Sequence, residues 1–284
     1  MDPLQFLTAA RVAVVAGKGG VGKTTVTAVL ARAAAQSGLR VLAVELDGKP
    51  TLASMVGDVP CISITSSAAL AEYLDTHGLR RVTKRLVTSG VIDLIATAAP
   101  GIDDIVVLGK LKQLERSDDY DLIVVDGPAA GHAITFLLSP QSLLDTVRGG
   151  PIRTQAAEVA AMLGDPERTQ VVLVTLPETT PVNEVIETAY TLEERIGVHL
   201  GPIVVNGIDD GPLLPVAAAA EGSALRAAAE FRNARRALHR AECLRLADDL
   251  ALPQIYLSLM AGSELDPAAI DRLATAWLAS GSTR

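Results

Sequence analysis

The sequence predicts an α/β fold in which helices cover both faces of a mostly parallel sheet of seven or eight strands. Short valine-rich segments alternate with helical segments along most of the 284 residues. A glycine-rich motif of the phosphate-binding type, G-x-x-x-x-G-K-[ST], follows the first predicted strand. The composition, 49% hydrophobic and 20% charged, suits one well-packed domain over residues 1–284.

The first predicted unit is strand, loop, helix and strand. Residues 11–17 (RVAVVAG) form a short apolar run that ends in glycine, as buried parallel strands do. Residues 23–38 are rich in alanine and leucine and predict a helix that Gly38 ends. Residues 40–48 (RVLAVELDG) predict the next strand. This βαβ unit is the context that a phosphate loop requires, so the fold class is that of the P-loop NTPases.

The same alternation continues along the chain. Further strands are expected at residues 61–65, 91–99, 120–128, 169–177, 201–208 and 252–259. A helix is expected over residues 181–196, where apolar side chains recur at helical spacing. Two segments depart from the alternation and predict helical insertions, at about residues 131–168 and 211–250.

The second insertion ends in an arginine-rich stretch that predicts a long surface helix or a helical pair. Its arginines are Arg226, Arg232, Arg235, Arg236, Arg240 and Arg245. They suit either a solvated helical face, balanced by Glu230 and Glu242, or a docking surface for an acidic partner.

Charge and composition argue against several functions. The formal net charge of −8 and an aromatic content of 3% disfavour nucleic-acid binding. No apolar run reaches the length of a membrane span, and the first residues lack the basic region of a signal peptide, so a cytoplasmic protein is expected. Cys61 and Cys243 lie far apart and form no C-x-x-C pair, the pattern of zinc or redox sites.

The motif itself predicts nucleoside triphosphate binding. Its residues are Gly17, Lys18, Gly19, Gly20, Val21, Gly22, Lys23, Thr24 and Thr25. Backbone N–H groups of such a loop cradle phosphate oxygens, and the helix N-terminus adds its positive dipole end. Lys23 is expected to neutralise phosphate charge and Thr24 to hold Mg²⁺.

Acidic residues at strand ends are expected to complete the site. Asp126 ends the strand with the clearest pattern and is expected to hold Mg²⁺ through water, although it could instead cap a following helix. The small residues GPAAGH after it predict a mobile loop that senses the γ-phosphate. Asp47 and Glu45 end the second strand; either could orient water or help hold Mg²⁺, with Asp47 nearer the phosphates.

The motif GKGGVGKTT resembles the deviant phosphate loop, K-G-G-x-G-K-[ST], of SIMIBI-class NTPases, and the rest of the chain resembles their ArsA/Get-type branch. The segments DGPAAGHAITFLLSP and APGIDDIVVLGKLKQL are similar to the second switch of that branch and to its P-G-x-x-E stretch. The segment VTLPETTPVNEVIETAYTLEERIG resembles its V-x-x-P-E-x-x-x-x-x-E-T helix start, and VVNGI its V-V-N. The chain is most similar to short, paired actinobacterial members.

The resemblance implies a Mg²⁺-dependent ATPase that works as a dimeric switch and couples ATP and ADP states to a partner or cargo. Lys18 would reach the nucleotide of the other subunit, Asp47 would be catalytic, and Asn206 would contact adenine. Metal contacts would come from Thr24, Asp47 and Asp126. The dimer would form with a second copy or with a paralogous ATPase. A protein cargo or a membrane-protein partner is also implied.

The chain departs from the family pattern at residues 45–50, which read ELDGKP where the family has S-T-D-P-A-H. This change raises an alternative, a weakly active regulatory subunit of a hetero-oligomer. The chain also lacks the family's interface C-x-x-C and has only four methionines. Residues 133–144 (AITFLLSPQSLL) could bind an apolar cargo helix but are better suited to the core or a subunit interface.

Overall fold

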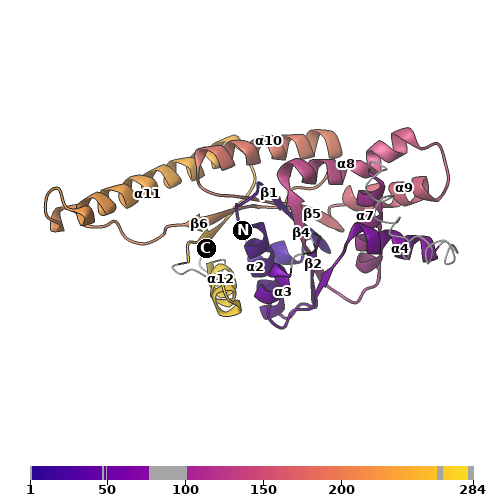
Figure 1. Ribbon diagram of the computed structural model, residues 1–284, viewed down its shortest axis with the longest axis horizontal. Helices are drawn as coiled ribbons and strands as arrows, with labels where there is room; N and C mark the ends of the chain where they lie inside the picture. Colours follow the sequence, from indigo (N-terminus) through magenta and orange to yellow (C-terminus); the bar gives the residue numbers. More distant parts are fainter. Residues whose placement is uncertain (1, 47, 49, 77–100, 261–264, 281–284) are drawn as a thin grey trace.

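The computed structural model describes residues 2–46, 48, 50–76, 101–260 and 265–280, and contains a parallel sheet between layers of helices (Figure 1). The seven strands in this part of the chain are β1 Val12–Gly17, β2 Val41–Glu45, β3 Cys61–Ser63, β4 Leu122–Ala129, β5 Thr169–Thr175, β6 Ile203–Ile208 and β7 Gln254–Ser258. Their order is β3-β2-β4-β1-β5-β6-β7, and every neighbouring pair is parallel. The sheet confirms the predicted fold class, whereas the strand expected at residues 91–99 lies outside the described residues.

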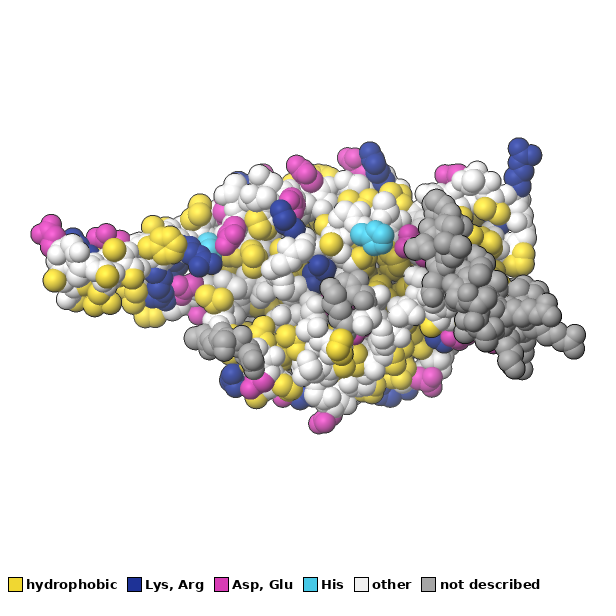
Figure 2. Space-filling model, viewed as in Figure 1, with side chains coloured by type: hydrophobic (Ala, Val, Ile, Leu, Met, Phe, Trp, Pro, Cys, Tyr) yellow, Lys and Arg dark blue, Asp and Glu magenta, His cyan; other side chains and the backbone are white. Residues whose placement is uncertain are grey.

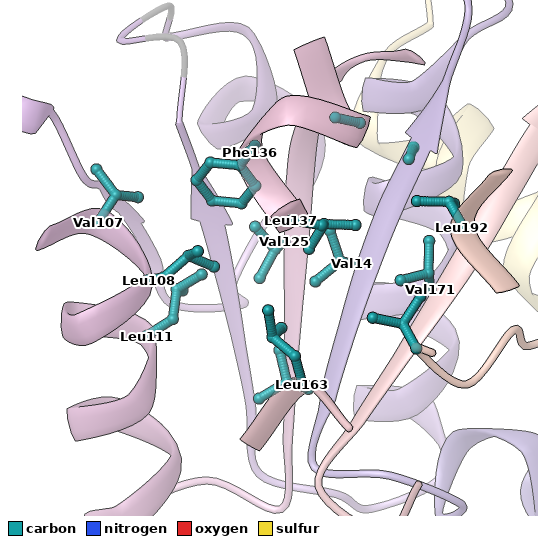
Figure 3. Packing of buried hydrophobic residues seen from close by; sticks show 14 of the residues in the cluster. Val14, Val107, Leu108, Leu111, Val125, Phe136, Leu137, Leu163, Val171 and Leu192 are labelled. Carbon is teal, nitrogen blue, oxygen red and sulfur yellow. The ribbon is translucent and has the colours of Figure 1, made fainter. Parts of the chain in front are cut away.

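Alternation along the strands divides the core into two halves. Val14 and Val125 face one side of the sheet, whereas Val15 and Val124, their neighbours in sequence, face the other. The first side is covered by α4 Ser66–Thr76, α7 Ile102–Arg116, α8 Ala130–Thr146, α9 Pro151–Leu163 and α10 Thr179–Ile196. The second is covered by α1 Pro3–Leu7, α2 Lys23–Gln36, α3 Thr51–Met55 and α12 Pro267–Ser280. Figure 3 shows Leu108, Leu111 and Leu163 packed over the strands of the first side.

The first predicted insertion forms α8 and α9, which lie against each other and against the sheet (Figure 1). Phe136 and Leu137 of α8 are buried in the core, so in this conformation the apolar stretch serves packing and is not an exposed cargo surface. Pro140 lies inside α8 without ending it. A proline there leaves the carbonyl of Phe136 without its helical donor, and the hydroxyl of Ser139 donates to that oxygen at 2.9 Å.

The second insertion contains η1 Val216–Ala218 and α11 Ala224–Asp249, a single helix of 26 residues. Of the two arrangements predicted for the arginine-rich stretch, a long helix and a helical pair, the structure therefore has the long helix. Its first turns project beyond the sheet, as the orange ribbon in Figure 1 shows. Within the described residues, no helix has both the length and the apolar character needed to cross a membrane.

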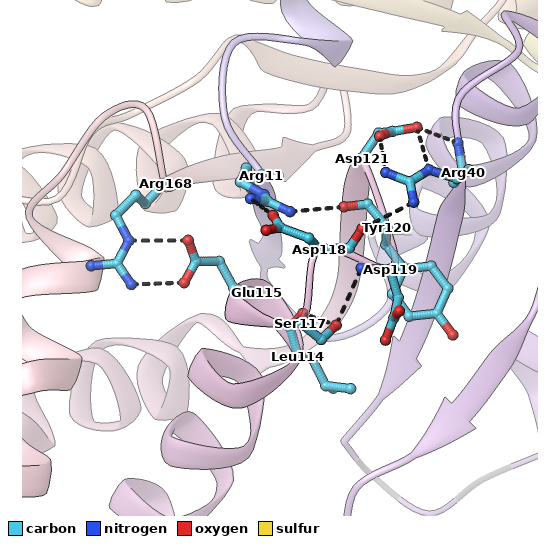
Figure 4. Close-up of polar contacts among 10 residues, drawn as sticks. All are labelled: Arg11, Arg40, Leu114, Glu115, Ser117, Asp118, Asp119, Tyr120, Asp121 and Arg168. Carbon is cyan, nitrogen blue, oxygen red and sulfur yellow. Dashed lines mark hydrogen bonds and ion pairs between the residues drawn. The ribbon is translucent and has the colours of Figure 1, made fainter.

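Ion pairs connect neighbouring elements at the edge of the sheet where the strands begin (Figure 4). Arg40 precedes β2 and Asp121 precedes β4; the guanidinium and backbone N–H of Arg40 both donate to this carboxylate and lower its pKa to about 2. Arg168, which precedes β5, donates twice to the buried carboxylate of Glu115 at the end of α7. These contacts lie at the edge opposite the one where the strands end, where the phosphate loop follows β1 and α8 follows β4.

Candidate nucleotide-binding site

The phosphate loop joins the end of β1 to the start of α2, as predicted. Gly17 is the last residue of β1, and Lys18 to Gly22 form the loop. A Cβ atom at Gly17 would lie 2.4 Å from the carbonyl oxygen of Val174, and one at Gly22 would lie 2.3 Å from Nδ2 of Asn206. Gly22 also has a φ of 89°, which disfavours residues with a side chain. The neighbouring strand backbone explains the need for glycine at position 17, and the positive φ together with the side chain of Asn206 explains it at position 22.

The remaining loop residues differ in exposure. Gly19 and Gly20 are exposed, whereas Val21 is buried and anchors the loop in the core. Lys23, Thr24 and Thr25 make up the first turn of α2. Backbone N–H groups at such a helix start have no partner within the helix, so this turn suits the oxygen atoms of a phosphate group.

Thr24 and Asp126 meet at the base of the loop although they are 102 residues apart in the sequence. The hydroxyl of Thr24 donates to the Oδ2 atom of Asp126 at 2.7 Å, and Thr27 approaches the other carboxylate oxygen at 3.5 Å. A hydroxyl and a carboxylate beside a phosphate loop are the oxygen ligands that suit Mg²⁺. Within the described residues no cluster of three or more His, Cys, Asp or Glu side chains could hold a metal ion.

The ends of β2 and β4 bring a second carboxylate to the same edge. Glu45 and Asp126 are register partners in the parallel pair of these strands, and Glu45 is buried. Burial raises the pKa of Cys61 on β3, and the negative charges of Glu45 and Asp126 raise it further. Asp47, the predicted catalytic residue, lies outside the described residues, so its role stays a prediction.

Lys18 contacts a residue that the sequence analysis did not single out. Its Nζ atom lies 2.5 Å from Oε1 of Glu184 on α10, and both side chains are partly exposed. An open cavity of about 430 Å³ adjoins this pair and is lined in part by Gly19, Ala130 and Thr188. Glu184 occupies the position of the second glutamate in the V-x-x-P-E-x-x-x-x-x-E-T pattern. The pattern therefore marks this residue, but it does not show that Glu184 contacts Lys18. Lys23 points back toward the loop, with its Nζ 3.4 Å from the carbonyl oxygen of Lys18.

Asn206 on β6 lies against the phosphate loop. Its side-chain N–H donates to the carbonyl oxygen of Val21 at 3.0 Å. This bond joins β6 to the loop, and the predicted contact with adenine stays a prediction.

The segment after Asp126 differs from the expected mobile loop. β4 continues to Ala129 and α8 begins at Ala130, so hydrogen-bonded structure spans the small residues GPAAGH. Their small side chains allow the chain to pass directly from strand to helix beside the loop. Asp104 lies at the start of α7, near His132 in the first turn of α8. Its pKa is raised to about 6, chiefly by burial and also by the charge of Asp103, while His132 opposes the rise.

Replacing Asp104 with asparagine is expected to stabilise the protein at neutral pH. The folded-state pKa of Asp104 lies above its ordinary value, so folding becomes less favourable as pH rises from about 4 to about 6 and the partly buried side chain ionises. Asp104→Asn should therefore raise the free energy of unfolding by ~1 kcal/mol at about pH 7.5 and have little effect at about pH 3.5. Urea titration at both pH values measures this difference. Asp145→Asn, at an exposed site near the other end of α8, is the control; equal effects of the two changes would refute the burial argument.

Comparison with known proteins agrees with this geometry. The sequence profile described as "Anion-transporting ATPase" matches residues 10–149, which contain the phosphate loop, Asp126 and the start of α8. The protein named ATPase BagA from Mycobacterium tuberculosis is 33% identical over 243 residues, a match that covers 76% of this chain and 71% of that protein. A protein named "Putative arsenical pump-driving ATPase" from Halobacterium salinarum is 28% identical over 67% of this chain. An "Arsenical pump-driving ATPase" from Escherichia coli is 29% identical over 67% of it.

The chain matches about a third of the length of these two pump-driving proteins, 34% and 33% respectively. The match to the mycobacterial protein spans most of both chains. On this similarity and on the profile match, the chain belongs to the anion-transporting, or ArsA-type, ATPase family.

Proposed function

We propose that this chain binds ATP with Mg²⁺ and hydrolyses it to ADP and phosphate, as a dimer whose nucleotide state controls binding of a partner. The observation that carries the proposal is the Thr24–Asp126 hydrogen bond at the start of α2, directly below the phosphate loop. A hydroxyl and a carboxylate side by side beside a phosphate loop support the binding of a phosphate-bound Mg²⁺. Membership of an ATPase family supports the same reaction.

Each residue of the site has a distinct role in this proposal. The loop N–H groups and Lys23 bind phosphate oxygens, Asn206 reads adenine, and Asp47 orients the attacking water. Thr24 and Asp126 hold Mg²⁺, which when bound neutralises charge on the phosphates. Lys18 stabilises the charge that develops in the transition state of the other subunit.

The Lys18–Glu184 contact supports a resting state of the proposed dimer, in which Lys18 does not act on the nucleotide of the other subunit. In this structure Lys18 is held by its own subunit, at the side of a cavity that opens beside the loop. Acting in the other subunit would require Lys18 to exchange Glu184 for phosphate. The dimer forms with a second copy or a paralogous ATPase, in the cytoplasm, and its partner is a protein, not a nucleic acid.

ATP turnover of the purified full chain tests the proposal. Phosphate release is measured with Mg²⁺ and with excess chelator, and Lys23→Ala is the inactive control. We expect turnover that depends on Mg²⁺ and on Lys23. Turnover that persists in Lys23→Ala, or a failure to bind ATP, would refute the proposal.

A second candidate is a regulatory subunit that binds nucleotide and hydrolyses it weakly by itself. It is favoured by the ELDGKP sequence at residues 45–50 and by the engagement of Lys18 within its own subunit. Turnover measured with and without a paralogous ATPase separates the two candidates. A regulatory subunit would bind ATP, show little turnover alone, and raise the turnover of the paralogue.

Replacing Glu184 with glutamine is expected to raise ATP turnover. A partly exposed ion pair contributes about 0.5–1 kcal/mol, so its loss should release Lys18 about two- to fivefold more often. Steady-state phosphate release measures the effect. Glu187→Gln is the matched control, since Glu187 lines the same cavity on the same helix. A rate that stays unchanged or falls in Glu184→Gln would contradict the resting-state role.

A further inference from the structure

Helix α10 carries the residue that holds Lys18, and α10 is itself held by α11. Glu184, the partner of Lys18, lies in the second turn of α10. Asn183, its neighbour in the sequence, accepts a hydrogen bond from Arg245 of α11 at 2.8 Å. The same turn of α10 therefore contacts the phosphate loop on one side and α11 on another. Figure 1 shows the last turns of α11 beside α10, whereas Figure 2 shows how far its first turns project from the body.

The contact between the two helices is a small polar network, called the α10–α11 network below. It consists of Thr179, Asn183, Glu242 and Arg245. The carboxylate of Glu242 accepts from the hydroxyl of Thr179 at 3.0 Å and from Arg245 at 2.7 and 3.0 Å. Glu242 is only 8% exposed, so these bonds reach a charge that is largely removed from water. Hydrogen bonds to such a charge are strong, and breaking them is costly, so the network is expected to hold α10 firmly.

Three contacts fix the rotation of α10 about its own axis. Val182 and Val185 are buried in the core, Asn183 faces α11, and Glu184 faces the phosphate loop. At about 100° per residue, these three directions lie about 100° to 130° apart around the helix. They therefore hold the helix from three sides, and removal of one leaves its rotation less well determined.

A small rotation of α10 would be enough to release Lys18. A turn of about 10° moves a side-chain tip that lies about 5 Å from the helix axis by about 1 Å. The distance between Lys18 and Glu184 is 2.5 Å, and such a shift would carry the contact beyond the usual range of about 2.7 to 3.2 Å. The hold on Lys18 thus depends on how well α10 is oriented.

From these contacts we infer that Asn183, Glu242 and Arg245 are positioning residues, which fix the rotation of α10 and so keep Glu184 in contact with Lys18. Helix α11 then controls how readily Lys18 leaves its own subunit. The inference rests on the proposed resting state and adds the element that regulates it. A partner that displaces the second half of α11 would open the network and release Lys18 for the other subunit.

Chemical labelling of Lys18 tests the inference in the absence of nucleotide. The full-length chain reacts briefly with the N-hydroxysuccinimide ester of acetic acid, and mass spectrometry gives the acetylation rates of Lys18 and Lys23. Asn183→Ala removes the acceptor on α10, and Arg245→Gln removes the charged donor on α11. Each should raise the rate of Lys18 about twofold, because an ion-paired amine must be released before it reacts. The rate of Lys23, in the same loop, should stay unchanged.

A double variant distinguishes positioning of Glu184 from a general loosening of the structure. In Glu184→Gln the side chain of Lys18 is already released, so the addition of Arg245→Gln should raise its rate no further. The matched control is Arg226→Gln, the same change in the first turn of α11, where Arg226 pairs with Glu230 at 3.1 Å. This control should leave the rate of Lys18 unchanged.

Three results would overturn the inference. They are an unchanged Lys18 rate in both network variants, an equal rise for Lys23, and a full further rise in the Glu184→Gln background. Circular dichroism shows that the variants fold; if Arg245→Gln does not, Asn183→Ala decides, since Asn183 is exposed. A chain that labels as expected but shows no ATP turnover would refute the proposed hydrolysis and keep the positioning role, so the two failures are distinguishable.

Discussion

Replacing Lys18 with alanine is expected to lower kcat for ATP hydrolysis by about 10³-fold while ATP affinity stays within about threefold of its original value. A cation supplied by a neighbouring subunit stabilises charge that develops only in the transition state, so its loss should affect the chemical step. In this structure Lys18 points to Glu184, and not into the cradle formed by the start of α2. Phosphate release and binding of a fluorescent ATP analogue measure the two effects separately.

A mixture of two variants tests whether Lys18 acts between subunits, at a Mg²⁺ concentration too low to support turnover by Asp126→Asn alone. In a dimer of Lys18→Ala with Asp126→Asn, one site keeps its own Asp126 and receives Lys18 from the neighbour. Random pairing of equal amounts in a twofold dimer should restore about a quarter of the original rate. Lys18→Ala alone is the baseline. No recovery would contradict action between two copies of this chain, and equal kcat values for Lys18→Ala and the unchanged chain would remove the catalytic role.

Replacing Asp126 with asparagine is expected to raise the Mg²⁺ concentration needed for half-maximal turnover by about 10- to 100-fold. The amide has nearly the shape of the carboxylate but lacks its charge, so it can still contact Thr24 while it attracts a cation less strongly. Turnover measured across a Mg²⁺ series gives the half-maximal concentration. Asp121→Asn is the control, since Asp121 precedes the other end of the same strand and binds Arg40. An unchanged Mg²⁺ requirement in Asp126→Asn would contradict the metal role.

The sheet was predictable because its strands carry a local signal. Segments such as residues 169–177 have an unbroken apolar centre, here VVLV, as strands buried on both faces commonly do, and β5 occupies Thr169–Thr175. The phosphate loop was predictable for a related reason: Gly17 lies against the backbone of Val174, and Gly22 has a positive φ and lies against the side chain of Asn206, so glycine is needed at both positions. The position of Thr24 at the start of α2 also follows from the motif alone.

Contacts between distant segments were not predictable from local patterns. Glu184 lies 166 residues from Lys18, and one residue less or more along α10 would turn its side chain by about 100° away from the loop. The continuous structure after Asp126 was missed because small residues suit both a mobile loop and a tight passage from strand to helix. The single long α11 was undetermined because charged and alanine-rich sequences favour a helix without fixing where it ends.

Strand β6 connects the phosphate loop to α11 over a short stretch of chain. The side chain of Asn206 donates to the carbonyl oxygen of Val21 in the phosphate loop. Three residues later, the carboxylate of Asp209 accepts hydrogen bonds from Arg232 of α11. A displacement of the phosphate loop that moves Asn206 would therefore reach Arg232, in the part of α11 whose first turns project beyond the sheet.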